Sequence, residues 1–119
     1  MNTISRIIIA SAFLFFATSA FACDYPRTPK LPNGGTASTA EMVTAVNAVK
    51  AYQAALEEYR TCLDAEEKEA IAALADPSED ELAIRKAAVS KKFNASVDDE
   101  ELLVARFNDE VVAYKAQSK

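Results

Sequence analysis

The residues with the clearest capacity for covalent chemistry in this sequence are its two cysteines, Cys23 and Cys62. In an oxidising compartment a cysteine pair in a small chain forms a disulfide by default, whereas cytoplasmic thiols stay reduced. Histidine is absent, which removes the commonest general base and the commonest metal ligand together. The chemistry available to the chain therefore depends first on whether it is exported.

The first 22 residues have the layout of a secretory signal peptide. Arg6 precedes an apolar run over residues 7–16, and small residues follow as far as Ala22. A signal peptidase requires small side chains at the third and first positions before the cut, and Ala20 and Ala22 supply them. The apolar run is about ten residues long, whereas a membrane-spanning helix needs about 20. We therefore predict a cleaved signal peptide over residues 1–22, no membrane span, and a periplasmic or secreted protein.

Charge and composition exclude several classes of function. The chain has a formal net charge of −5, and loss of Arg6 with the signal peptide would make it −6. Nucleic acids and anionic membranes should repel such a chain. The sequence has no Gly-rich phosphate loop, no CxxC pair and no serine beside a base, so we expect no enzyme activity and no cofactor. The sequence does not indicate whether a small molecule binds.

Acidic side chains gather in two runs, residues 66–69 and 98–101. Crowded carboxylates can bind a cation or respond to pH, because like charges raise one another's pKa. Neither run has the spacing of a calcium-binding loop. We therefore interpret both as solvated faces and expect no metal site.

Residues 23–37 predict an extended arm. Prolines at positions 26, 29 and 32 match the three-residue turn of polyproline II, which leaves backbone groups solvated. Pro32 to Gly35 then predicts a turn, because Asn and Gly accept the left-handed conformations of tight turns.

Residues 39 to about 75 predict a first long helix. Ser38 and Glu41 can cap its start, and neither glycine nor proline interrupts it before Pro77. Its apolar residues fall in two rows at seven-residue spacing, as on one face of a coiled-coil helix. One row is Met42, Val49, Leu56, Leu63 and Ala70, and the other is Ala45, Tyr52 and Tyr59, which Glu66 would continue.

A second long helix should follow, to about residue 116. Asp76-Pro77 ends the first helix, and Ser78 with Glu81 forms a capping box for the next. Apolar spacing of three and four continues downstream with one charged lapse at Glu100. The residues that we single out on this stripe are Val89, Phe93, Val104, Phe107 and Val111. The stretch Asn94 to Asp99 holds poor helix formers, so a break into three helices remains an alternative.

A tight connection near Pro77 would lay these helices antiparallel, with facing residue numbers that sum to about 154. The expected fold is therefore all-α: an antiparallel, coiled-coil-like hairpin of long helices over residues 38–119, preceded by the arm. Two such helices bury only one stripe each, so we expect the stripe residues to form both the core and an interface.

A disulfide between Cys23 and Cys62 would explain how the arm is held. Cys62 lies about 36 Å along the first helix from its start, at 1.5 Å per residue. An arm of 15 residues in polyproline II form reaches about 46 Å. The arm can therefore run back antiparallel along the first helix and bring Cys23 to Cys62. Tyr25 and Leu31 are its expected apolar contacts.

The string from Cys23 to Gly35, with Glu41-Met42, Val49 to Tyr52 and Tyr59 to Leu63, resembles small uncharacterised exported helical proteins of Gram-negative bacteria. The resemblance implies a periplasmic location and brings no activity with it.

These observations leave three hypotheses for function. The first is a non-catalytic periplasmic protein that acts through contacts with itself or another envelope protein. The second is an outer-membrane lipoprotein acylated at Cys23, because this cysteine follows the cleavage site and Lys119 ends the chain. The third is an acid-responsive periplasmic chaperone, suggested by the pI near 4.7 and the crowded acidic residues.

Overall fold

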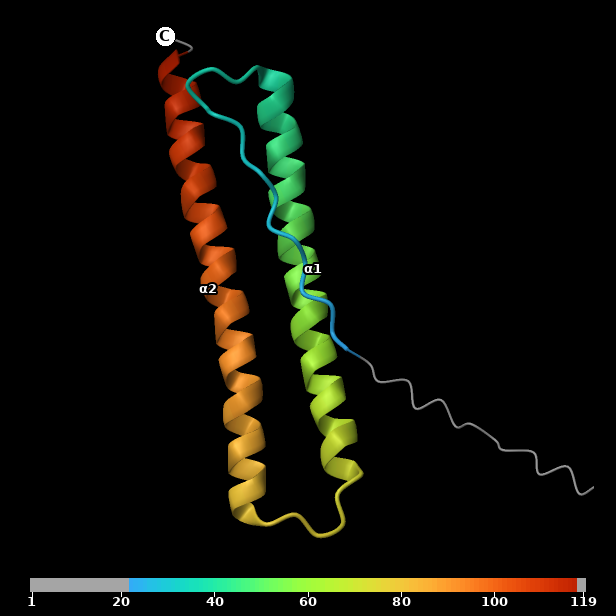
Figure 1. Ribbon diagram of the computed structural model, residues 1–119. Helices are drawn as coiled ribbons and strands as arrows, with labels where there is room; N and C mark the ends of the chain where they lie inside the picture. Colours follow the sequence, from blue (N-terminus) through green and yellow to red (C-terminus); the bar gives the residue numbers. More distant parts are fainter. Residues whose placement is uncertain (1–21, 118–119) are drawn as a thin grey trace, which may run out of the picture.

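A computed structural model describes residues 22–117, which form two long helices and an extended N-terminal arm (Figure 1). Helix α1 spans Thr39–Ala72 and helix α2 spans Glu79–Gln117. The described residues contain no β-strand. The prediction of an all-α hairpin with an extended arm is confirmed. The predicted signal peptide lies outside the described residues except for Ala22, as does Lys119.

Helix α1 begins and ends close to the predicted positions. Ser38 and Glu41 form a capping box: the Ser38 hydroxyl accepts from the backbone N–H of Glu41, and the Glu41 carboxylate accepts from that of Ser38. The helix ends at Ala72 rather than near residue 75. In the connection that follows, Asp76 takes a φ of 58°, a left-handed conformation that aspartate tolerates better than most residues.

Helix α2 is continuous, so the alternative with a break between Asn94 and Asp99 is excluded. The hydroxyl of Ser96, the residue that could have capped a third helix, donates to the Phe93 carbonyl 2.6 Å away. This bond lies within the helix and leaves Ser96 fully buried. At the start of α2, Ser78 and Glu81 form the predicted capping box.

The helices pack antiparallel in the predicted register. The Arg85 guanidinium binds the Glu67 carboxylate at 2.9 Å near the connection. At the opposite end the hydroxyls of Thr39 and Tyr114 lie 2.5 Å apart. The numbers of these pairs sum to 152 and 153, close to the expected 154.

The core lies mainly along α1. Seven of the eight α1 stripe residues are buried, and Ala70 is half-buried; the buried ones are Met42, Ala45, Val49, Tyr52, Leu56, Tyr59 and Leu63. On α2, in contrast, the buried residues are Ser96 and Leu103. Phe93 is 38% exposed, and the other four α2 stripe residues, Val89, Val104, Phe107 and Val111, are half-buried. The centre of the α2 contact is thus displaced from the stripe that hydrophobic spacing indicates.

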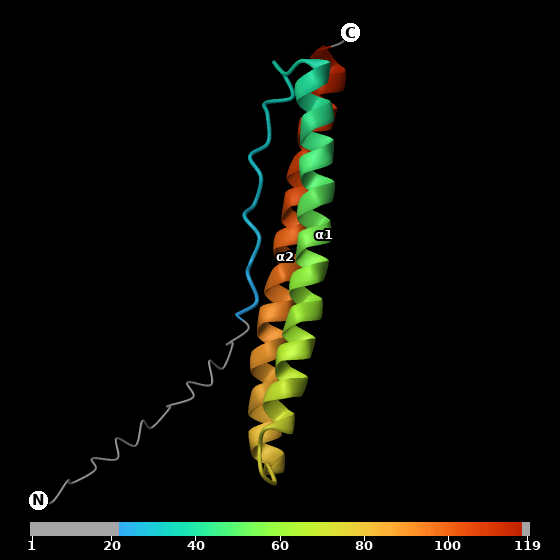
Figure 2. The same ribbon diagram turned by 90° about the vertical axis from the view of Figure 1, so that its right-hand side faces the viewer.

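The arm runs along one face of the helix pair, and in Figure 2 it lies clearly to one side of both helices. It is joined to α1 by a turn in which the Asn33 carbonyl accepts from the backbone N–H groups of Thr36 and Ala37. The Asn33 side chain accepts from the N–H of Gly35. Neither glycine has a positive φ, so the turn does not use the left-handed conformations that we expected.

Gly34 is required at this turn by space rather than by conformation. Its N–H donates to the Glu110 carboxylate at 2.6 Å, and a Cβ at this position would overlap the backbone carbonyl of Glu110. Gly34→Ala should therefore push the turn away from α2 and lower the free energy of unfolding by about 1–3 kcal/mol. Chemical denaturation followed by circular dichroism measures the change.

Gly35→Ala is the matched control, because its Cβ would meet only the tip of the Asn33 side chain, at 3.2 Å. Equal losses of stability in both variants would contradict the proposed close approach.

Candidate functional site

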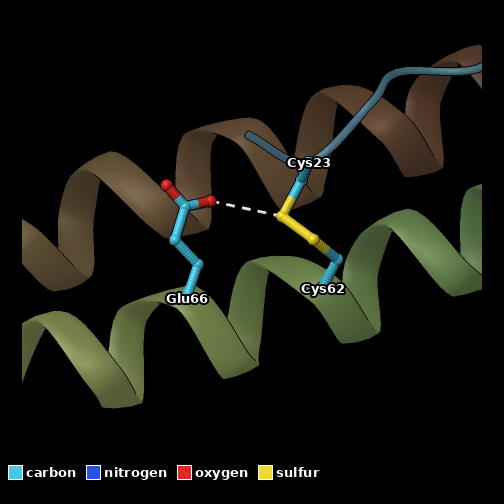
Figure 3. Close-up of a disulfide and its surroundings, with 3 residues drawn as sticks. All are labelled: Cys23, Cys62 and Glu66. Atoms are coloured by element: carbon cyan, nitrogen blue, oxygen red, sulfur yellow. Dashed lines mark hydrogen bonds between the residues drawn. A yellow bond between two sulfur atoms is a disulfide. The ribbon is translucent and has the colours of Figure 1, made fainter. Parts of the chain in front are cut away.

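The disulfide between Cys23 and Cys62 fixes the end of the arm to α1 beyond the midpoint of the helix (Figure 3). The two Cα atoms lie 5.7 Å apart, and 39 positions separate the residues in sequence. The predicted pairing and the antiparallel path of the arm are both confirmed. Within residues 22–117 no free cysteine remains for nucleophilic chemistry.

A carboxylate lies beside this bond. Glu66, one turn beyond Cys62 on α1, has its Oε2 3.2 Å from the Cys23 sulfur (Figure 3). A disulfide sulfur carries no hydrogen, so this contact is a close approach of a negative charge and not a hydrogen bond donated by sulfur. Because reduction begins with attack by an anionic thiolate, the neighbouring carboxylate should slow it.

Tyr25 connects the arm to both helices near the disulfide. Its ring packs edge-on against Tyr59 of α1, with ring centroids 4.9 Å apart. Its hydroxyl donates to the Asp99 carboxylate of α2 at 2.5 Å. Nearby, the Thr28 hydroxyl donates to the Tyr52 hydroxyl at 3.3 Å. The arm thus bridges the groove between the helices.

Partial burial of Tyr25, followed by its hydrogen bond to Asp99, raises the pKa of the phenol well above its ordinary value of 10.0. A raised pKa means that the folded protein holds this proton more tightly than the unfolded chain. The corresponding stability is complete below pH 10 and is lost as the pH rises through the folded pKa. The side chain is 42% exposed, so solvent screens part of the effect.

We therefore predict that the Tyr25 phenol ionises only well above pH 10, when the arm leaves Asp99. The difference in tyrosinate absorbance between the wild type and Tyr25→Phe should show one phenol that titrates well above pH 10. A difference curve centred at pH 10 would contradict the bridge to α2.

The half of the arm nearer the turn covers the core. Leu31 packs against a cluster of buried residues from both helices, namely Val49, Tyr52, Leu56 and Leu103. At the turn, the Gln117 amide donates to the carbonyls of Gly34 and Ala37 at 2.8 and 2.7 Å. The last turn of α2 therefore also holds the arm in place.

The opposite side of the helix pair is not covered by any described segment (Figure 2). We call it the open face. Two hollows lie on it: one of about 570 Å³ includes Leu82, Lys86 and Ser90, and one of about 490 Å³ includes Val97 and Glu101. The α2 residues that line a hollow under the arm are different, namely Leu103, Arg106, Asp109 and Glu110.

A polar cluster lies on the open face at the edge of the hollow that includes Val97 and Glu101. The Arg60 guanidinium binds Glu100 at 2.9 Å and lies over the ring of Phe93, 5.7 Å from its centroid. Gln53 also donates to Glu100, at 3.2 Å. These partners explain why a glutamate can interrupt the α2 stripe. Because Phe93 remains 38% exposed beside this cluster, the open face has an aromatic side chain at its centre.

Two further findings concern ligands and membranes. Within residues 22–117, no group of three or more acidic or cysteine side chains is arranged to hold a metal ion. Neither α1 nor α2 has a stretch apolar enough to cross a membrane.

The geometry defines a disulfide-stapled helical hairpin with the arm over one face as far as Cys62 and no described segment over the opposite face. Comparison with known proteins gives no match, whether with family models, curated proteins or solved structures.

Proposed function

We propose that this chain is a non-catalytic, exported protein that acts in the cell envelope through protein–protein contacts made by its open face. The observation that supports this proposal best is the unequal coverage of the hairpin. The arm packs Tyr25 and Leu31 over one face, whereas the other leaves Phe93 exposed between two hollows. Exposed apolar surface with a polar rim is typical of interaction sites.

Export is supported by the disulfide, because such bonds persist in oxidising compartments. The proposed periplasmic location also agrees with the signal-peptide pattern of residues 1–22 and with the resemblance to small exported proteins of Gram-negative bacteria.

Site-specific crosslinking in intact cells tests this function. A photo-reactive residue in place of Ser90, on the open face, should form crosslinks to protein. The same residue in place of Ala95 is the matched control, because Ala95 is exposed but lines neither hollow of the open face. Equal crosslinking from both positions, or none from either, would overturn the proposal.

The acid-responsive chaperone remains a second candidate, because carboxylates accept several of the polar contacts that hold the fold together. Asp99 and Glu110 anchor the arm, and Glu67 and Glu100 join the helices. The backbone N–H and then the hydroxyl of each capping serine lower the pKa of Glu41 and Glu81. Their contribution to stability is therefore complete above the ordinary carboxyl range and is lost as the pH falls through the lowered pKa. If falling pH neither loosens the arm nor lets the protein suppress aggregation of a client, this candidate fails.

The lipoprotein alternative is less compatible with this geometry. Acylation uses the sulfur of Cys23, and that sulfur is bonded to Cys62. A lipidated chain would lose the staple and leave Cys62 unpaired. Incorporation of labelled palmitate distinguishes a lipidated chain from a chain with the disulfide.

A further inference from the structure

Three α2 residues of each hollow on the open face lie at symmetric positions about one point on α2. Ser90 and Val97 are three and four residues from Phe93, and Lys86 and Glu101 are seven and eight residues from it. Leu82 and Ala105 continue the series at eleven and twelve. Spacings of three, four, seven and eight keep side chains on one side of a helix. These six residues therefore share one side of α2, and the midpoint of each pair falls between Phe93 and Asn94.

The hollows also carry complementary charge. In the hollow away from the connection, Glu100 is neutralised by Arg60, so Glu101 leaves one negative charge. In the other hollow, Glu67 is neutralised by Arg85. Its remaining charged groups are Asp64, Lys68 and Lys86, which leave one positive charge. Neither Lys86 nor Glu101 forms a salt bridge among the described residues.

We propose that the open face binds a second copy of this chain, with the two α2 helices antiparallel about a two-fold axis beside Phe93. A two-fold interface is self-complementary, so each contact occurs twice. In antiparallel helices centred here, Lys86 of each copy lies opposite Glu101 of the other, and Ser90 lies opposite Val97. The two Phe93 rings meet at the axis. The inference rests on the proposed function and specifies its partner.

A second copy fits this surface because the chain itself supplies both halves of the charge pattern. A partner with one sign of charge would match only one hollow. The interface also places the most exposed aromatic side chain of α2 at its centre, beside the paired Arg60 and Glu100, with the unpaired charges of Lys86 and Glu101 further out. Aromatic residues are enriched at the centres of interfaces. The arm is on the other side of the hairpin, so dimerisation requires no rearrangement of it (Figure 2).

Charge reversal tests this geometry. Sedimentation equilibrium of the oxidised protein should show a monomer–dimer equilibrium. Lys86→Glu and Glu101→Lys should each weaken it about tenfold or more, because each reversal replaces two attractive contacts with two repulsive ones. The double variant Lys86→Glu/Glu101→Lys should restore dimerisation to near the wild-type level.

Lys91→Glu and Asp98→Lys form the matched control, because both residues are exposed and line neither hollow. They change the same charges on the same helix and should leave dimerisation unchanged. Circular dichroism verifies that every variant keeps its helices. Failure of the double variant to recover, or equal effects of the control pair, would overturn the proposed register.

The same experiments separate the inference from the function on which it rests. A wild-type protein that stays monomeric, while position 90 crosslinks to a different envelope protein, would overturn the dimer and leave the interaction function standing. A strict monomer with no crosslinks from position 90 would overturn both.

Discussion

Replacing Cys62 by alanine should lower the free energy of unfolding by about 4 kcal/mol, the largest effect that we expect from any single substitution. The disulfide closes a loop of 39 positions, and a loop of this size restricts the unfolded chain strongly. For a domain of this length, about 4 kcal/mol is a large share of the total stability. Denaturant unfolding of the oxidised variant and wild type, monitored by circular dichroism, gives the difference.

The control for this prediction is a test of whether the stability losses of the two cysteine substitutions add. Cys23→Ala removes the same bond, so the double variant Cys23→Ala/Cys62→Ala should be no less stable than either single variant by more than about 0.5 kcal/mol. Treatment of the wild type with reductant should produce a similar loss. Additive losses from the two substitutions, or a stable variant without the bond, would contradict the staple.

Leu56→Ala should lower the free energy of unfolding by about 3 kcal/mol, within the usual range for a buried leucine. Leu56 has no exposed surface and lies in the cluster with Val49, Tyr52 and Leu103, under Leu31 of the arm. Two helices and an arm offer few neighbouring side chains that could collapse into the cavity. Thermal and denaturant unfolding measure the effect.

Leu102→Ala is the matched control. This leucine is adjacent in sequence to the buried Leu103 but is 49% exposed, so its truncation should change stability by less than about 0.5 kcal/mol. Equal losses of stability in both leucine variants would contradict a core that contains Leu56 and Leu103 but not Leu102.

The arm and its disulfide could be predicted from the sequence because they depend on the distance that the arm can span and on export to an oxidising compartment. Three prolines set the rise per residue of the arm, and the position of Cys62 on a helix sets the distance to be covered. The α1 core was predictable for a similar reason. Its buried residues, from Met42 to Leu63, are apolar at regular spacing, so periodicity alone locates the face.

The contact surface of α2 was harder to predict because polar residues interrupt it. The row with seven-residue spacing that faces the core is Val89, Ser96, Leu103 and Glu110. Hydrophobic spacing does not detect it, because Ser96 and Glu110 are polar. Each can face the core only because the fold gives it a hydrogen-bond partner. The Ser96 hydroxyl donates to the Phe93 carbonyl, and the Glu110 carboxylate accepts from the N–H of Gly34. The apolar stripe read from the sequence lies partly on the open face.

The role of Gly34 and the end of α1 also depend on tertiary contacts. A Pro-Asn-Gly-Gly string predicts a turn, but only the packed helices show that the turn approaches the backbone of Glu110. Similarly, Pro77 marks the end of α1 only approximately, because the helix ends at Ala72 and the connection then passes through a left-handed Asp76.

The most direct test is mass analysis of the protein recovered from its exporting cell, without reductant. We predict a chain that begins at Cys23, carries no lipid, has no free thiol, and releases a peptide pair joined through Cys23 and Cys62. Free thiols, an acylated Cys23, or a disulfide found only between two chains would contradict this prediction.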